Sequence, residues 1–363
     1  MIRVGLVTNW QEACAVAEYA NSLVTHVDDP EVEFKIITRP LTFERIMNEA
    51  RDVDVLHFNV AWWLFDGITG DQWRAFRKRG KRVLITLHES YEPEIRSLGG
   101  LGPAADAIVV HEEPSDGLAW PEGFYYIPQG IRLVEGLPKW NRLDREAYKL
   151  GTLGFPFWWK NYRLTAKVAR KLGLGFMFLM GKPKSDKVDL DAITQEILEI
   201  HPEAEIVTGW QPYDYMVRRL SECVATVFPY NEAAKIYGVS AGVRMGMAAQ
   251  RPIIVSKHAQ QFKDLKKYPD EVYVTHSSKL EEAISLVLQD TKDRCERKPA
   301  ELLKVMSWRA CATKYVQIYK ELANMRVVPV VEDYAKQEQE EVEHLRRKFE
   351  VEKMGRMEKE YKF

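Results

Sequence analysis

Short apolar runs alternate with longer amphipathic stretches along most of the chain. The runs are continuously apolar, which is typical of parallel strands buried on both faces. The intervening stretches, such as "EACAVAEYANSLVTHV", carry apolar residues at helical spacing. This order predicts an α/β fold with doubly wound parallel sheets. The strands expected in the first half are "IRVGLVT", "VEFKIIT", "VDVLHFNV", "KRVLITLH", "ADAIVVH" and "GFYYIPQGI".

A polar, charged stretch at Trp140–Tyr148 interrupts this alternation and predicts a linker between two domains. The alternation then restarts, so both halves are expected to be Rossmann-like. Ligands of open α/β sheets bind at the carboxyl ends of the strands, and the cleft between the domains is therefore the expected active site. The strands expected in the second half are "KLGTLGF", "GFMFLMG", "AEIVTG", "VATVFPY", "PIIVS" and "EVYVT".

The segment "SWRACATKYVQIYKEL" predicts a helix that returns to the first domain. Its residues Trp308, Tyr315, Tyr319 and Leu322 recur at spacings of seven, four and three, which places them on one helical face. We expect this helix to pack on the first domain and to form a two-strand hinge with the Trp140–Tyr148 linker. The expected division is a first domain of 1–141 with a return helix at about 308–325, a second domain of 142–307, and a tail of 331–363.

Charge dominates the tail, where Val342, Leu345 and Phe349 have helical spacing but Glu352 and Arg356 interrupt the apolar stripe. A solvated helix and a helix for weak self-association are both consistent with this pattern. We assign the tail no catalytic role.

Composition narrows the class of protein. The chain has 363 residues, 46% hydrophobic and 29% charged, as expected of globular material in two domains. A net charge of −1 supplies no global basic field for nucleic acid or an anionic membrane. The start "MIRVGLVT" is a strand rather than a signal peptide, and no apolar run could span a bilayer, so we expect a cytoplasmic protein. Scattered reduced thiols, without a disulfide or zinc site, are expected at Cys14, Cys223, Cys295 and Cys311.

Several enzyme classes lack their motifs. The loop "TNWQEACAVAEY" after the first strand contains no glycine, which argues against a dinucleotide-dependent dehydrogenase. A P-loop of the form G-x-x-x-x-G-K-[ST] is also absent, which argues against an ATPase or GTPase. Asp189 and Asp191 could form a metal-binding D-x-D, but we favour a cap for the helix "DAITQEILEI".

The stretch "FPYNEAAKIYGVSAGVRMGMAAQRPIIVS", Phe228–Ser256, combines a strand, a glycine-rich turn and a small-residue helix. A helix N-terminus presents free N–H groups and a partial positive charge, which suit a phosphate. Gly238 and Gly242 would let the backbone approach a ligand, and Ser240 would cap the helix or touch the ligand. An ordinary strand–loop–helix with a serine cap explains this stretch alone equally well.

Several segments, in order, resemble the retaining GT-B glycosyltransferases of the group 1 type, which use nucleotide-sugar donors. The resemblance spans about Ile2 to Leu322. It is carried by "CAVAEYANSLV", "DVDVLHFNVAWWLF", "VLITLHE", "ADAIVVH", "YYIPQGI", "LGTLGFPFWWKNYRLTAKVARKL", the Phe228–Ser256 stretch and "SWRACATKYVQIYKEL".

This resemblance implies transfer of a sugar from a UDP- or GDP-sugar to a hydroxyl acceptor, with retention. Because the chain lacks an exposed carboxylate pair and offers Lys160 and a helix terminus for the electrostatic task, we expect neither a cofactor nor a metal. The resemblance places His88 near the donor sugar and Lys160 beside the leaving phosphates. For both residues an ordinary role remains open, as a strand-end histidine and as a solvated lysine at a helix start. The donor-binding residues that it implies are Glu232, Gly238, Val239, Ser240, Gly242 and Arg244.

The chain departs from the family pattern at two places. Many relatives carry two glutamates eight positions apart around the donor helix, where this chain has Tyr237 and Met245. Glu232 could replace the first of them only at a different spacing. The arginine that often precedes the lysine is absent from "GFPFWWK". The identity of the nucleotide therefore stays open.

The acceptor stays open as well. Trp62, Trp63 and Trp158 follow strands and could stack on a sugar or acceptor, or pack between the domains. The acceptor could be a glycan or small molecule. One alternative is a hydroxylated base in DNA, as for some phage enzymes of related fold, with Arg74 to Arg82 lining a basic groove. The other is a non-catalytic GT-B-like binding protein.

Overall fold

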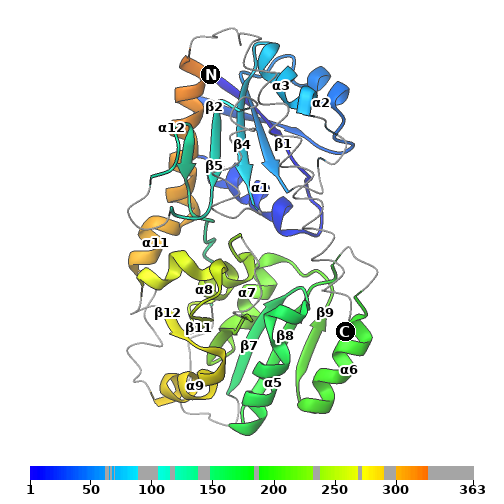
Figure 1. Cartoon of the computed structure of the whole chain (residues 1–363), viewed down its shortest axis with the longest axis vertical. Helices are drawn as coiled ribbons and strands as arrows, with labels where there is room; N and C mark the ends of the chain where they lie inside the picture. Colours follow the sequence, from blue (N-terminus) through cyan, green and yellow to red (C-terminus); the bar gives the residue numbers. More distant parts are fainter. Residues whose placement is uncertain are drawn as a thin grey trace.

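Two six-stranded parallel sheets, each flanked by helices, lie one above the other (Figure 1). This computed structural model describes residues 1–61, 65, 68, 70–88, 105–114, 119–137, 148–183, 188–231, 238–268, 272–289 and 300–325. The predicted α/β architecture is confirmed, and each of the twelve predicted strands forms within a few residues of its expected ends. Among the described helices, none has the length and hydropathy that crossing a membrane requires.

The first sheet has the strand order β2-β1-β3-β4-β5-β6. Its strands are β1 (Ile2–Val7), β2 (Val32–Ile37), β3 (Val55–Val60), β4 (Arg82–Leu87), β5 (Ala107–Val110) and β6 (Phe124–Tyr126). Helices α1 (Ala15–His26), α2 (Phe43–Glu49) and α3 (Gly70–Lys78) connect them. Every residue of β3 is buried, because helices cover both faces of the sheet.

The second sheet has the order β12-β11-β10-β7-β8-β9. Its strands are β7 (Lys149–Gly154), β8 (Gly175–Met180), β9 (Glu205–Thr208), β10 (Ala225–Phe228), β11 (Ile253–Ser256) and β12 (Val272–Thr275). Its helices are α5 (Tyr162–Lys171), α6 (Leu190–Ile200), α7 (Tyr213–Ser221), α8 (Ala241–Ala248) and α9 (Leu280–Gln289).

The order of the second sheet reverses between β7 and β10, and this is the switch point where such sheets bind ligands. β7 pairs with β8 along its whole length, from Lys149 to Gly154. Its pairing with β10 is limited to Leu150 and Gly151. The two strands therefore separate toward their carboxyl ends, which leaves room there for the loops that follow them.

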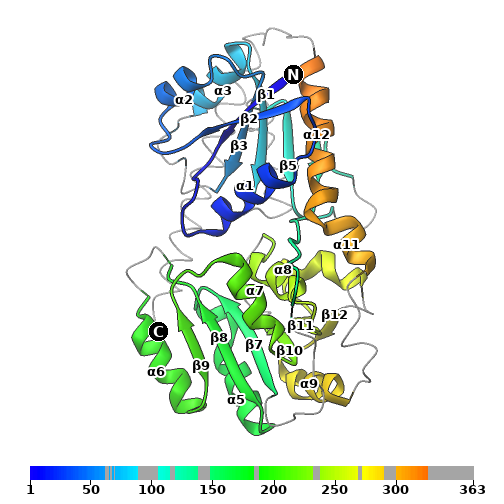
Figure 2. The ribbon, with the colours of Figure 1, turned by 180° about the vertical axis from the view of Figure 1, so that it is seen from behind.

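Helix α12 (Trp308–Asn324) returns from the second half and packs on the first sheet, where it appears in orange (Figures 1 and 2). The Tyr315 hydroxyl lies 2.7 Å from that of Tyr19 on α1 and 2.8 Å from Thr86 Oγ1 on β4. His57 of β3 continues the chain of hydrogen bonds, with its ring nitrogens 2.8 Å from the hydroxyls of Thr86 and Tyr319. These buried polar groups satisfy one another, so α12 is held to the sheet in one register.

The chain crosses between the two halves at a small paired site. Ile131 forms a parallel bridge with Ser307. The Ile131 N–H donates to Met306 O at 2.7 Å, and the Trp308 N–H donates to Ile131 O at 3.2 Å. A Cβ on Gly130 would lie 2.5 Å from the Trp308 ring, so glycine is needed there. The hinge pairing therefore occurs at Ile131, ahead of the linker expected at Trp140–Tyr148, of which 140–147 lies outside the described residues.

Arg132 ties the two halves together beside this crossing. Its guanidinium lies 3.2 Å from a Glu18 carboxylate oxygen on α1 and 3.0 Å from one of Asp214 on α7. It also stacks over the Tyr213 ring, 4.1 Å from the ring centroid. Burial raises the pKa of Glu18, while the Arg132 charge opposes that shift. Glu18 is thus part of a contact between the halves.

We expect Trp308→Ala to lower the free energy of unfolding by about 3–5 kcal/mol, the usual cost of truncating a buried aromatic residue. The Trp308 side chain is 4% exposed and covers Gly130. Denaturant unfolding followed by circular dichroism measures the change. The matched control is Arg309→Ala, an exposed neighbour on the same helix, which should change stability by less than about 0.5 kcal/mol. Equal effects of the two variants would contradict this account of the crossing.

Candidate active site

The carboxyl edges of the two sheets meet each other. Glu112 follows β5 of the first sheet, and Gly238 follows β10 of the second. A carboxylate oxygen of Glu112 accepts a hydrogen bond from the Gly238 N–H at 3.0 Å. This contact brings the loop after β5 and the residues that lead into α8 together between the two halves.

Lys160 ends a 3-10 turn, η5 (Trp158–Lys160), just after β7. Its ammonium folds back over Gly154, the last residue of β7, where a Cβ would lie 2.6 Å from Nζ. Gly154 also has φ of +127°, a conformation that favours glycine. The ammonium lies 5.2 Å from the centroid of the Trp159 ring and 5.6 Å from that of Tyr230. Glycine at the strand end thus lets the lysine enter the switch point of the sheet.

Burial lowers the pKa of Lys160 from 10.5 to about 7. The residue is 8% exposed, and no described carboxylate counters this shift. Two aromatic faces offer it weak cation–π contacts, which offset only part of the lost hydration. A desolvated ammonium of this kind gains most from a bound anion, since the anion supplies the missing opposite charge.

The N-terminus of α8 lies close by. Ser240 is its N-cap residue, but its hydroxyl makes no capping bond and lies 2.9 Å from the hydroxyl of Tyr230, the same ring that faces Lys160. The first N–H groups of a helix have no partners within the helix, and here the serine side chain leaves them available. Lys160, Tyr230 and the start of α8 therefore form one cluster with an excess of donors and positive charge.

The glycines of α8 bring the helix close to its own sheet. A Cβ on Gly242 would lie 3.3 Å from the carbonyl oxygen of Leu153 on β7. One on Gly246 would lie 2.8 Å from the Phe228 ring on β10. The small residues thus seat the helix start directly over the separating ends of β7 and β10.

Arg244 lies inside the protein. Its guanidinium forms a buried ion pair with Asp264 of the 3-10 segment η6 (Gln260–Lys267), and both side chains are 3% exposed. Its charge is therefore compensated within the second half. Val239 and Ser240 are half-buried at the loop surface, and Glu232 lies outside the described residues.

His88 follows β4 and is half-buried at the edge of the first sheet. The Asn59 amide group fixes the protonation of its ring. Asn59 Nδ2 donates to Val16 O and to Thr8 Oγ1, each at 3.1 Å, so its Oδ1 faces His88 Nε2 in a short hydrogen bond. Because an amide oxygen only accepts, Nε2 carries the proton and Nδ1 keeps a lone pair.

The surroundings of His88 keep it neutral. The edge of Tyr19 lies 4.6 Å from its ring centroid, and the His111 ring lies 5.2 Å away. Burial, assisted by His111 and His57, moves the pKa of His88 well below its usual value. The first sheet therefore presents a neutral acceptor nitrogen at its edge, whereas the second presents the buried Lys160 amine.

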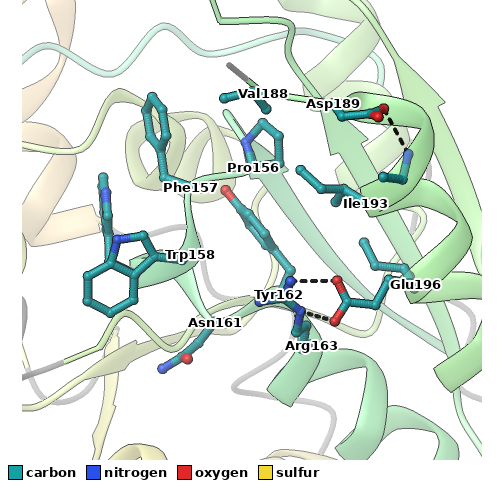
Figure 3. Close-up of a pocket in the computed structure, with 13 residues that line it drawn as sticks. Pro156, Phe157, Trp158, Asn161, Tyr162, Arg163, Val188, Asp189, Ile193 and Glu196 are labelled. Carbon is teal, nitrogen blue, oxygen red and sulfur yellow. Dashed lines mark hydrogen bonds and ion pairs between the residues drawn. The ribbon is translucent and has the colours of Figure 1, made fainter. Parts of the chain in front are cut away.

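Trp158 is 48% exposed and lines a pocket of about 400 Å³ between the η5 turn and α6 (Figure 3). An ion pair between Arg163 and Glu196 forms another part of its wall. Lys160, in the same turn as Trp158, does not line this pocket. Trp62 and Trp63 lie outside the described residues.

Asp189 caps α6, as favoured from the sequence, since its carboxylate accepts from the N–H groups of Asp191 and Ala192 at 3.0 Å. Within the described part of the chain, no group of three or more His, Cys, Asp or Glu side chains is placed to hold a metal ion.

The basic run Arg74 to Arg82 lies away from this region. Arg82 opens β4, whereas His88 follows its other end. Arg77 and Arg82 each lie 3.2 Å from an Asp106 carboxylate oxygen, so that acid compensates part of the charge. The basic groove expected for DNA therefore does not face the cleft.

Sequence reasoning missed three residues of the site: Glu112, Tyr230 and Asn59. Glu112 lies two residues after the end of β5, and Tyr230 lies two residues after the end of β10. A survey of the polar residues after every predicted strand would have found them. Asn59 lies within β3, where the sequence offers no signal beyond a polar residue in an apolar run.

No protein-family description matches the chain, and no curated protein is similar to it in sequence. Solved structures are similar in three dimensions. HepE of Anabaena, Alr3699, in complex with UDP and glucose has a TM-score of 0.66 at 10% identity, over 88% of this chain and 100% of that one. The chain has the GT-B fold.

Two further solved structures share this fold, with similar TM-scores and sequence identities. An alpha-glucosyltransferase in complex with UDP-glucose and DNA has a TM-score of 0.62 at 11% identity, over 88% of this chain and 99% of its own. A protein of E. coli named for trehalose-6-phosphate, bound with UDP-2-fluoro glucose, has a TM-score of 0.62 at 12% identity, over 89% and 99%. At such identities the likeness establishes the GT-B architecture of this chain.

The low pKa of Lys160 has a consequence for stability. Because the folded pKa of about 7 lies below the unfolded value of 10.5, the unfolded chain binds more protons between these values, and stability rises with pH across that range. We expect the free energy of unfolding to rise by roughly 1–3 kcal/mol between about pH 7 and pH 9 relative to Lys160→Met. Urea unfolding of both proteins across this range measures the difference. Parallel curves would show that the ammonium is well solvated.

Proposed function

We propose that the protein is a glycosyltransferase that moves a sugar from a UDP- or GDP-sugar to a hydroxyl acceptor, with retention and without a metal ion. The observation that carries this proposal is the buried Lys160 ammonium, uncompensated among the described residues, beside the start of α8 at the β7–β10 switch point. Both features suit a diphosphate. The structural neighbours with bound UDP or UDP-sugars support this reading.

Charge stabilisation is the central chemical task of such a transfer. As the bond between the sugar and the diphosphate breaks, negative charge builds on the leaving phosphate and positive charge on the sugar ring. Lys160 and the first N–H groups of α8 would stabilise the phosphate. His88 Nδ1 would accept a hydrogen bond from a hydroxyl of the donor sugar. Because its low pKa keeps the ring neutral, His88 would position the sugar without adding a positive charge next to it. Trp158 would offer a stacking face to a sugar.

A screen of nucleotide sugars tests the proposed class. Each UDP- and GDP-sugar is incubated with the protein without acceptor, and release of the nucleoside diphosphate is measured. We expect slow hydrolysis of one donor, because water replaces the acceptor in many active sites of this kind. A panel without hydrolysis or nucleotide binding would leave the non-catalytic binding protein as the better account.

We expect Lys160→Met to lower the turnover of that donor by a factor of about 10²–10³, equivalent to about 2.7–4 kcal/mol in the barrier. Lys167→Met is the matched control, since Lys167 is exposed on α5, seven positions after Lys160. The control should keep the parent rate. Equal rates for Lys160→Met and the parent would place Lys160 outside the reaction.

We also expect activity to survive chelation. The proposed charge stabilisation uses an ammonium and a helix terminus in place of a metal ion. Turnover measured with and without EDTA checks this. Loss of activity with EDTA and recovery with manganese would contradict the proposal.

The acceptor is proposed as a glycan or small molecule. A DNA base is the second candidate, since one neighbour is an alpha-glucosyltransferase bound to DNA, but the Arg74–Arg82 run gives it no support at the cleft. Binding to duplex DNA at two salt concentrations separates the two acceptors. A cytoplasmic location and weak self-association through 331–363 are further proposals from the sequence.

A further inference from the structure

Glu112 reaches across the cleft and is not used in the proposed transfer. It follows β5 on the first half, and its carboxylate accepts from the N–H of Gly238, on the loop that leads into α8. Gly238 has φ of +89°, so the loop turns in a conformation that favours glycine. Glu112 is 9% exposed and Gly238 is buried. A carboxylate of the first half is thus held inside the donor region of the second.

The next residue, Glu113, also contacts the second half. Glu113 forms an ion pair with Lys267 of η6, and Lys263 Nζ lies 3.4 Å from the Glu113 carbonyl oxygen. The segment 112–113 therefore touches the second half at several points, and its position relative to that half is fixed by more than one bond.

The charge of Glu112 matters because of what the donor site would hold. A sugar in transfer must face the cleft, since the acceptor arrives there. The phosphate that carries the sugar is then the one nearer the first half, and so nearer Glu112. While the sugar is attached, this phosphate carries one negative charge. After transfer it is a terminal phosphate, with a second negative charge near neutral pH.

We propose that Glu112 is a specificity residue that favours the nucleotide sugar over the free nucleoside diphosphate, and so promotes release of the product. This inference rests on the proposed function. The carboxylate and the terminal phosphate compete for the Gly238 N–H and repel each other. The esterified phosphate of the donor carries less charge, and its sugar hydroxyls can donate to the carboxylate.

Binding measurements on three proteins test the role of Glu112: the parent, Glu112→Gln and the control Glu122→Gln, at an exposed glutamate just before β6. Glutamine keeps the shape of Glu112 and an oxygen for the Gly238 N–H, but removes the charge. Isothermal titration is performed with UDP and UDP-glucose, and with GDP and GDP-mannose as a second pair. We expect Glu112→Gln to lower the Kd of the free diphosphate by at least about fivefold and that of the nucleotide sugar by less than about twofold. The control should change neither.

Each other outcome overturns the inference. If Glu112→Gln binds the free diphosphate as the parent does, or more weakly, the inference fails while nucleotide binding by the parent still supports the proposed function. If no nucleotide binds to either protein, the proposed function fails and the inference with it.

A second measurement uses the parent alone, so that it does not depend on the folding of a variant. The β-methyl ester of the bound diphosphate carries one charge less and has no sugar. We expect the parent to bind this ester at least as tightly as the free diphosphate. Weaker binding of the ester than of the free diphosphate would overturn the inference, because the extra charge would then be attracted rather than repelled.

Discussion

The burial of one positive charge at the end of β7 shapes the rest of the site. Lys160 can enter the switch point only because Gly154 has no side chain, and burial then lowers its pKa to about 7. A charge in such a place costs folding free energy, which the rest of the fold must offset. A bound anion would recover this cost. Under the proposed function, the stability lost by burying Lys160 would be regained when the diphosphate binds.

The arrangement of the halves depends on where the chain crosses between them. The bridge between Ile131 and Ser307, covered by Trp308, joins both crossing segments at one point. From there α12 is held to the first sheet by its buried tyrosines. Because both crossings share one short pairing, the carboxyl edge of the first sheet stays opposite that of the second, and Glu112 can reach Gly238.

The two edges differ in their electrostatic character. On the second sheet, an ammonium and a helix N-terminus present donors and positive charge. On the first, Asn59 sets His88 as a neutral ring with an acceptor nitrogen, and Glu112 adds a carboxylate. A phosphate is suited to one edge and hydroxyl groups to the other. This complementarity matches a ligand that carries a phosphate at one end and a sugar at the other.

The strands could be predicted from the sequence alone, since continuous apolar runs bounded by polar loops have few other solutions, and Lys160 and His88 could be placed after strands. The sequence also identified the buried face of α12 by its helical spacing. Which polar groups are compensated could be seen only in the folded chain. Arg244 reads as a ligand contact in the sequence, yet Asp264, twenty positions away, neutralises it. Glu112 reads as an ordinary acid, yet it meets a loop of the other half. Hydrophobic periodicity is local along the chain, whereas charge compensation depends on neighbours that only folding brings together.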